Sequence, residues 1–186
     1  MEIYDEKIAN KDFTKEPFQA TEIDDCEFDT CSFQSTELKS KKFTDCLFKS
    51  CNFSLTGFFN STLRGCRFVD CKMIGVNWTE LYSVSDLEFE SCHLVDGVFM
   101  NLDLSGFKFI SSNICGADFS ESNLQGSSFA GSELKHATFR GNNLIKADFS
   151  AASNYSIDIR FNKVENAIFS LPEAMSLLSG LGVILK

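Results

Sequence analysis

The sequence is poor in several residue types that mark common protein classes. Its 186 residues include two prolines, two histidines and one tryptophan, and 26 acidic side chains outnumber 17 basic ones. The formal net charge of −9 argues against a nucleic-acid binder, which needs a basic surface, and against docking on anionic membranes. No run of 18 apolar residues is present, so the sequence predicts no transmembrane helix.

The N-terminal residues lack the apolar segment of a signal peptide. We therefore expect a cytoplasmic protein whose eight cysteines are reduced thiols and not a disulfide framework. His93 and His136 stand alone, and no nucleotide-binding glycine motif is found. The sequence thus predicts no catalytic residue, metal or cofactor, and the protein is not expected to be an enzyme.

Phenylalanine, by contrast, is abundant, and 17 of the 20 phenylalanines recur with a period of five residues. Large apolar residues occupy every fifth position from Phe13 to Trp78, slip by one residue, and resume from Val84 to Phe169. Asn154 is the one failure. Helices repeat apolar residues at spacings of three and four, and strands at two, so a period of five indicates a chain that turns a corner every five residues.

A second period of twenty residues sets the size of the coil. Cys26, Cys46 and Cys66 lie twenty apart, each two residues before a large apolar position, in a slot that alanine and serine fill later in the chain. Four five-residue steps therefore close a square, and the Cys-x4-Cys spacing indicates packing and not a metal site. Coils stacked about 4.8 Å apart would align identical side chains. The predicted core ladder is Phe28, Phe48, Phe68, Phe89, Phe109, Phe129, Phe149 and Phe169.

Short segments of the second half resemble the repeat unit of pentapeptide-repeat proteins. The clearest are Ala117-Asp118-Phe119-Ser120 and Ala147-Asp148-Phe149-Ser150. The resemblance covers about residues 11–169 and implies an all-β solenoid, a right-handed quadrilateral β-helix of about eight coils with a short C-terminal capping helix. We assign residues 1–170 to this β-helix.

Residues 171–186 follow a different pattern. Pro172 and Glu173 suit the first turn of a helix that continues to Gly180 or Gly182, and Ser170 suits its N-cap. A short strand over residues 183–185 follows. The segment either only caps the solenoid or also forms a homodimer through its apolar residues. The predicted interface comprises Met175, Leu177, Leu178, Leu181, Val183 and Leu185.

The tail from Asn154 to Gly182 is similar to the ends of Qnr-type quinolone-resistance proteins and of the microcin B17 immunity protein. This resemblance implies a bacterial type II topoisomerase as partner, DNA gyrase above all or topoisomerase IV. The protein would act as a partial DNA mimic that protects the enzyme from quinolones or peptide poisons. The alternative is a generic scaffold for protein–protein interaction with no role at a topoisomerase.

Outward residues give the candidate surfaces. Residues 1–93 contain 17 acidic and 10 basic side chains, against 9 and 7 in the second half. The candidate topoisomerase-facing acidic surface comprises Glu22, Asp24, Asp25, Glu27 and Asp29, which flank two inward positions. The one-residue slip predicts a small projecting bump at Glu80, Leu81 and Tyr82, in place of the two projecting loops that the Qnr resemblance would imply.

Overall fold

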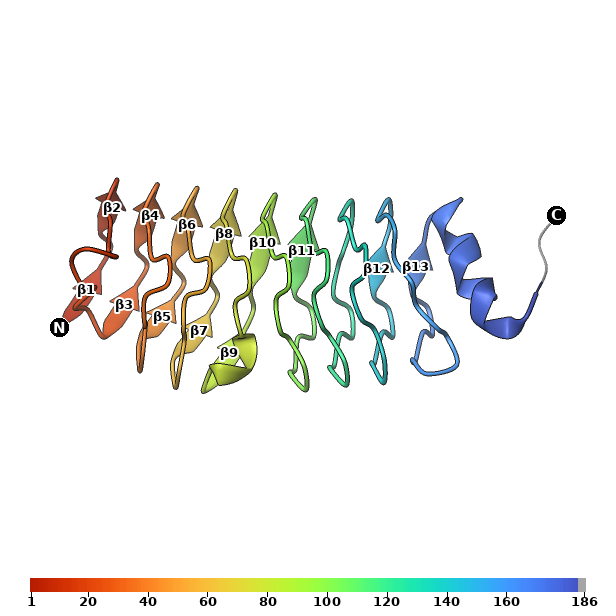
Figure 1. The fold of residues 1–186 in the computed structure, drawn as a ribbon. Coiled ribbons are helices and arrows are strands. Elements are labelled where there is room, and N and C mark those ends of the chain that lie inside the picture. Colours follow the sequence, from red (N-terminus) through yellow and green to blue (C-terminus); the bar gives the residue numbers. More distant parts are fainter. Residues whose placement is uncertain (184–186) are drawn as a thin grey trace.

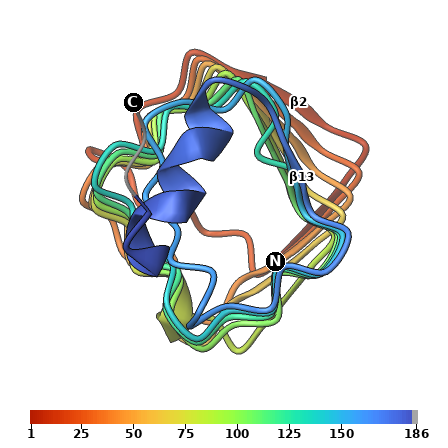
Figure 2. The same ribbon diagram turned by 90° about the vertical axis from the view of Figure 1, so that its right-hand side faces the viewer.

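The structure is a computed structural model and describes residues 1–183. It confirms the predicted solenoid: the chain winds into a long rod, with the N-terminus at one end and the C-terminal helix at the other (Figure 1). Viewed along the rod, the coils superpose on a four-sided outline (Figure 2). The core fills the inside of this outline along the whole rod.

Short parallel strands form two sides of the outline. One sheet has the order β1 (Glu2–Tyr4), β3 (Glu22–Asp24), β5 (Lys42–Thr44), β7 (Thr62–Arg64) and β9 (Ser83–Ser85). The other sheet comprises β2 (Lys7–Ala9), β4 (Glu27–Asp29), β6 (Leu47–Lys49), β8 (Arg67–Val69), β10 (Glu88–Glu90) and β11 (Lys108–Ile110). Further along the rod, β12 (Asp148–Phe149) pairs with β13 (Ile168–Phe169). Partners are offset by twenty residues, or by 21 where the slip intervenes, as in Phe68 opposite Phe89.

Aromatic rings stack along the rod because each coil places the same residue above its predecessor. In the column from Phe28 to Phe169, successive ring centroids lie 4.9 to 5.2 Å apart, and the planes differ by no more than 16°. Rings from the adjacent column meet this stack edge-on, as Trp78 meets Phe89 at 5.3 Å and 80°. Both arrangements are favourable for aromatic pairs.

The small inward slot carries a ladder of hydrogen bonds. Its side chain donates to a carbonyl 23 or 24 residues earlier: the Cys71 thiol to Phe48 O at 3.4 Å, and the Ser132 hydroxyl to Phe109 O at 2.6 Å. Burial raises the pKa of the Cys26 thiol, which keeps it a protonated donor. The cysteines of this slot thus do what serine does later in the chain. All eight cysteines are free thiols, and seven of them are buried.

Each coil turns its corners with residues in left-handed backbone conformation. At one corner the sequence places Asp25 (φ 49°), Asp45 (φ 51°) and Gly65 (φ 64°) at equivalent positions. Glycine adopts this conformation freely, and aspartate and asparagine tolerate it better than most residues. The corner requirement therefore explains why such residues recur at this position of the repeat.

The N-terminal coil carries the five-residue repeat to positions before Phe13, where the aromatic pattern starts. The solenoid begins earlier than Phe13, since Ile3 pairs with Ile23 and Ile8 with Phe28. Phe18 does not simply continue its column. Its ring packs against Phe28 at 5.7 Å, and also against Phe13, Phe33 and Phe43, so that it closes this end of the core.

The last coil also departs from the regular pattern. Ile159, expected inside, is partly exposed, while Tyr155 and Ile157 are buried. The helix after it, η2 (Glu173–Leu181), is a 3-10 helix. Ser170 does not cap η2, because its hydroxyl accepts a hydrogen bond from Ala151 N at 3.0 Å. Of the expected strand, Val183 is not in a strand, and Leu185 lies outside the described residues.

We predict that Phe89→Ala lowers the free energy of unfolding by about 3–5 kcal/mol, because it leaves a cavity in the middle of the ring stack. Phe59→Ala is the matched control, since the Phe59 ring is 54% exposed and contacts Lys39 from outside. The control should cost less than about 1 kcal/mol. Urea unfolding followed by circular dichroism measures both, and equal losses for the two variants would contradict the stacked core.

Candidate interaction surface

The described residues contain no group of three or more His, Cys, Asp or Glu side chains that could hold a metal ion. None of the helices in residues 1–183 is both long and apolar enough to cross a bilayer. Because side chains fill the inside of the coils, the chemistry of the rod lies on its outward columns. The candidate site is therefore a surface and not a cleft.

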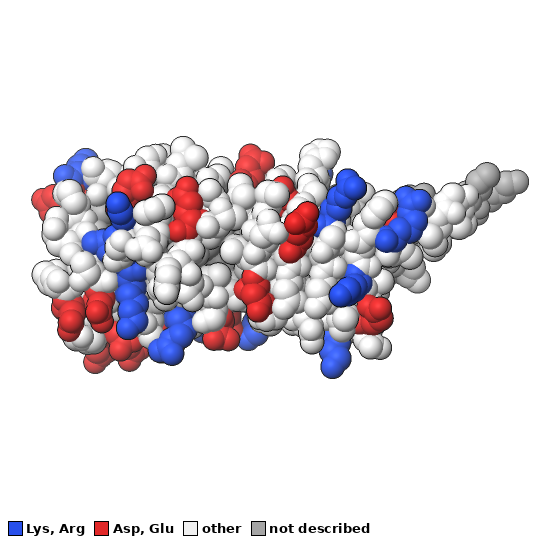
Figure 3. All heavy atoms as spheres, turned by 90° about the horizontal axis from the view of Figure 1, so that it is seen from below, with Lys and Arg blue, Asp and Glu red and all other residues white. Residues whose placement is uncertain are grey.

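The structure brings the five acidic residues together at one corner of the second coil. Glu22 and Asp24 lie on β3, Glu27 and Asp29 lie on β4, and Asp25 forms the corner between the two strands. The inward neighbours Ile23, Cys26 and Phe28 are buried, so the carboxylates alternate with them and point outward. In the space-filling view, acidic side chains gather at the N-terminal end of the rod (Figure 3).

Lysines from neighbouring coils neutralise part of this surface. Glu27 lies 2.8 Å from Lys49 Nζ and 3.5 Å from Lys7 Nζ, and Glu22 lies 3.9 Å from Lys42 Nζ. The hydrogen bond from Lys49, assisted by the charge of Lys7, lowers the pKa of Glu27.

The other three acids of the surface are less neutralised. Asp24, Asp25 and Asp29 make no ion pair with any described residue. Asp29 only accepts a hydrogen bond from the Thr30 hydroxyl at 2.8 Å. Negative charge available to a partner is therefore concentrated on these three carboxylates.

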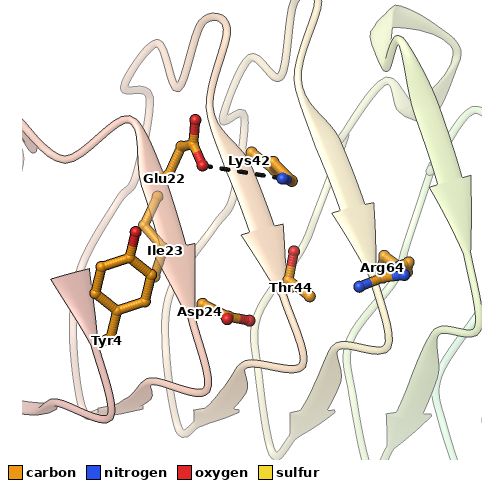
Figure 4. A pocket seen from close by; sticks show the side chains of 7 residues that line it. All are labelled: Tyr4, Glu22, Ile23, Asp24, Lys42, Thr44 and Arg64. Atoms are coloured by element: carbon orange, nitrogen blue, oxygen red, sulfur yellow. Dashed lines mark ion pairs between the residues drawn. The ribbon is translucent and has the colours of Figure 1, made fainter. Parts of the chain in front are cut away.

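A shallow depression lies on the outer face of β1, β3, β5 and β7 (Figure 4). Its lining residues are Tyr4, Glu22, Ile23, Asp24, Lys42, Thr44 and Arg64. The Tyr4 hydroxyl donates to the Glu2 carboxylate, which raises the pKa of Tyr4 to about 12. At about 110 Å³ the depression is far smaller than the roughly 300 Å³ of a usual ligand site, so it is surface relief beside the acidic corner.

Sequence reasoning missed a row of aspartates along the same corner. Asp5, Asp25 and Asp45 occupy equivalent left-handed positions on three successive coils. The row stops at Gly65. The Asp45 carboxylate extends over this glycine, because a Cβ added at position 65 would lie only 1.9 Å from Asp45 Oδ1. The twenty-residue period contains this row, since the three aspartates are twenty residues apart. The row extends the acidic surface along the rod.

The slip in the repeat forms a turn of 3-10 helix, η1 (Trp78–Glu80). Asn77 caps it by accepting a hydrogen bond from Thr79 N at 3.2 Å. Of the three bump residues, Glu80 and Tyr82 are exposed, Tyr82 by 78%, whereas Leu81 is partly buried against the core. The surface feature therefore consists of Glu80 and Tyr82, with Leu81 as its anchor.

A sequence model of the pentapeptide repeat region matches residues 21–84 and 82–149. The chain belongs to the pentapeptide-repeat family. No curated protein matches the sequence.

Two solved structures of pentapeptide-repeat type are similar to this one along most of its length. A trypsin-treated variant of QnrB1, a plasmid-mediated fluoroquinolone resistance protein, superposes with a TM-score of 0.62 at 18% identity, covering 98% of this chain and 99% of the other. HetL, involved in heterocyst differentiation regulation in the cyanobacterium Nostoc sp., superposes with a TM-score of 0.67 at 14% identity, covering 90% of this chain and 84% of the other. At these identities the similarity establishes the fold.

We predict that Glu27 titrates below the ordinary glutamate range and that Lys49→Met raises its pKa. A lowered pKa in the folded state means that this ion pair stabilises the fold above the unfolded pKa, and that the stabilisation is lost as pH falls through the folded pKa. Carboxyl carbon shifts recorded by NMR across acidic pH measure both values. An unchanged Glu27 pKa in Lys49→Met would show that the pair does not persist in solution.

Proposed function

We propose that this pentapeptide-repeat protein binds a bacterial type II topoisomerase in the cytoplasm and protects it from a quinolone or a peptide poison. DNA gyrase is the favoured enzyme, with topoisomerase IV as its counterpart. Protection requires no chemistry by the bound protein, so the proposal assigns no catalytic residue. The acidic surface at the corner of β3 and β4 is the part that contacts the enzyme.

The observation that carries the proposal is the superposition of the whole rod on a fluoroquinolone resistance protein, which covers 98% of this chain. The rod has a filled core, and its second coil has the acidic corner. Sequence resemblance in the tail, from Asn154 to Gly182, points to the same group of proteins. A surface that contacts a DNA-binding site should present carboxylates where duplex DNA presents phosphates.

Charge density shows where such mimicry is feasible. Eight coils at about 4.8 Å give a rod of about 38 Å, over which nine net charges reach roughly 40% of the density of duplex DNA. Residues 1–29, however, contain ten acidic and three basic side chains. They span about one and a half coils, or roughly 7 Å of rod, where a duplex carries about four charges. The N-terminal end therefore equals or exceeds the duplex, and we place the contact there.

The alternative function is a protein–protein interaction scaffold unconnected with topoisomerases. The fold is also similar to HetL, whose described role is in heterocyst differentiation regulation, and this similarity favours the alternative. Lysines bound to Glu22 and Glu27 also favour it, because a dedicated DNA mimic would leave those carboxylates free.

We predict that the protein restores supercoiling by DNA gyrase in the presence of ciprofloxacin or microcin B17. Neutralising the free part of the acidic surface with Asp24→Asn, Asp25→Asn and Asp29→Asn should lower this protection about tenfold or more, because three unpaired charges are lost. The measurement is a supercoiling assay over a range of protein concentrations.

The matched control removes three acidic charges from the second half of the rod with Asp96→Asn, Asp103→Asn and Glu121→Gln. This variant should protect as well as the wild type. If both triple variants lost protection equally, a general effect of negative charge would explain protection better than a defined surface. Failure of the wild type to change supercoiling or its inhibition would favour the scaffold alternative.

We also propose that the protein forms a homodimer through its C-terminal segment. The η2 segment leaves Leu171, Met175 and Leu181 exposed by 79%, 46% and 48%, and Val183 by 49%. Leu177 packs against the core instead, and Leu178 is half-buried. These four apolar side chains belong to one short segment at the C-terminal end of the rod, and exposed apolar residues that gather in one place are typical of an interaction site.

We predict that Met175→Asp combined with Leu181→Asp converts a dimer to a monomer, because two charges would be buried in the interface. Leu55→Asp combined with Phe59→Asp is the control, since these apolar side chains are at least as exposed but lie on the third coil, far from the C-terminal segment. Sedimentation velocity distinguishes the species. The dimer is refuted when the wild type sediments as a monomer at micromolar concentrations.

A further inference from the structure

The irregular last coil contains a side cavity of about 290 Å³. It is lined by Ala137, Thr138, Phe139, Arg140, Ser156, Asp158 and Phe161. It lies near the C-terminal end of the rod, six coils away from the acidic corner of β3 and β4. The surface proposed to contact a topoisomerase does not include it.

The cavity exists because the repeat breaks between residues 154 and 162. A regular coil would place left-handed corners at Ser156 and Phe161, but neither has a positive φ, and Asn154 has one instead. Ile159, which the five-residue period assigns to the position above Phe139, is partly exposed. Phe139 therefore stacks on Phe119 at 5.2 Å on one side and lines the cavity.

Two guanidinium groups lie against the exposed ring of Phe161. Arg140 Cζ is 5.3 Å and Arg160 Cζ 5.5 Å from its centroid. Arg160 is occupied by Asp158, to which it donates from Nε at 3.0 Å and from Nη2 at 2.6 Å. Arg140 makes no ion pair with any described residue. The cavity is thus bordered by one neutralised ion pair, Arg160 with Asp158, and by one cation available to a ligand, Arg140.

The chemistry of these residues defines a ligand. A guanidinium stacked on an aromatic ring keeps its N–H edge free, and that edge fits a carboxylate with two parallel hydrogen bonds. The apolar lining from Ala137, Phe139 and Phe161 suits the body of the ligand, and the hydroxyls of Thr138 and Ser156 can orient it. A single available cation beside the Asp158 carboxylate favours a monoanion over a doubly charged phosphate.

We propose that this cavity binds a carboxylate carried on an apolar, planar group. Such a carboxylate can belong to a free aromatic acid or to the C-terminal residue of a peptide that ends in phenylalanine. Its volume is close to the roughly 300 Å³ at which ligand sites begin, and it is open to solvent, so one ring and its carboxylate fit inside while the rest of a peptide stays outside.

Titration of the full chain with sodium benzoate, followed by amide NMR shifts, tests the site. We expect saturable shifts confined to Thr138, Arg140, Ser156, Phe161 and their neighbours. Benzamide, which has the same shape without the charge, should bind roughly tenfold or more weakly. Acetyl-Ala-Phe with a free carboxylate and its amidated form are the peptide arm, and whichever acid binds more tightly identifies the source of the carboxylate.

Arg140→Gln should abolish the benzoate shifts, whereas Lys135→Gln, which removes one exposed positive charge from the same coil, should leave them unchanged. Unchanged amide spectra elsewhere show that both variants are folded. Equal binding of benzoate and inorganic phosphate, shifts spread over the lysines of the whole rod, or full binding by Arg140→Gln would each overturn the proposal. These outcomes leave the topoisomerase proposal untouched, since gyrase protection is measured separately.

Discussion

The structure depends on the match between the spacing of its coils and the centroid separation that stacked aromatic rings prefer. Parallel coils bonded through their backbones lie about 4.8 Å apart, and the Phe column stacks at 4.9 to 5.2 Å between ring centroids. These separations lie within the range favourable for offset-stacked rings, so every coil can contribute the same residue. The hydrogen-bond ladder of the inward slot imposes the same interval a second time. Together they keep successive coils in register, even across the 21-residue coil at the slip, and leave the outward residues unconstrained by packing.

This division between inside and outside explains how a rod with a filled core can acquire specific surfaces. Inward positions are limited to large apolar residues and small donors, and corners to residues that accept a positive φ. The remaining positions can vary at small cost in stability, since surface substitutions usually change it by less than about 0.5 kcal/mol. Asp5, Asp25 and Asp45 satisfy a corner requirement and build the acidic corner at the same time. The same three residues thus satisfy the backbone geometry of the corner and supply the charge of the surface.

Much of this was accessible from the sequence, because the period of five has a single structural explanation. The coil, the ring columns and the outward direction of the five acids follow from it. The two ends were not predictable in the same way. An end coil lacks a neighbour on one side, so spacing no longer determines where Phe18 or Ile159 lies. Ile3 and Ile8 obey the period but carry no aromatic signal. The twenty-residue offset places Lys7 opposite Glu27, but it places Lys49 opposite Asp29, and only the structure shows that Lys49 reaches Glu27 diagonally.

The breaks in the repeat are where the surface gains features that a regular coil cannot offer. The slip at η1 exposes Tyr82 while Leu81 anchors the turn. The break at Asn154 gives up a filled column above Phe139, and the Phe139 ring lines a pocket as a result. Residues 134–163 contain five basic and two acidic side chains, whereas residues 1–29 contain three basic and ten acidic side chains. The rod therefore has an acidic N-terminal end and a basic stretch that precedes its C-terminal end, and its packed core holds the two a fixed distance apart.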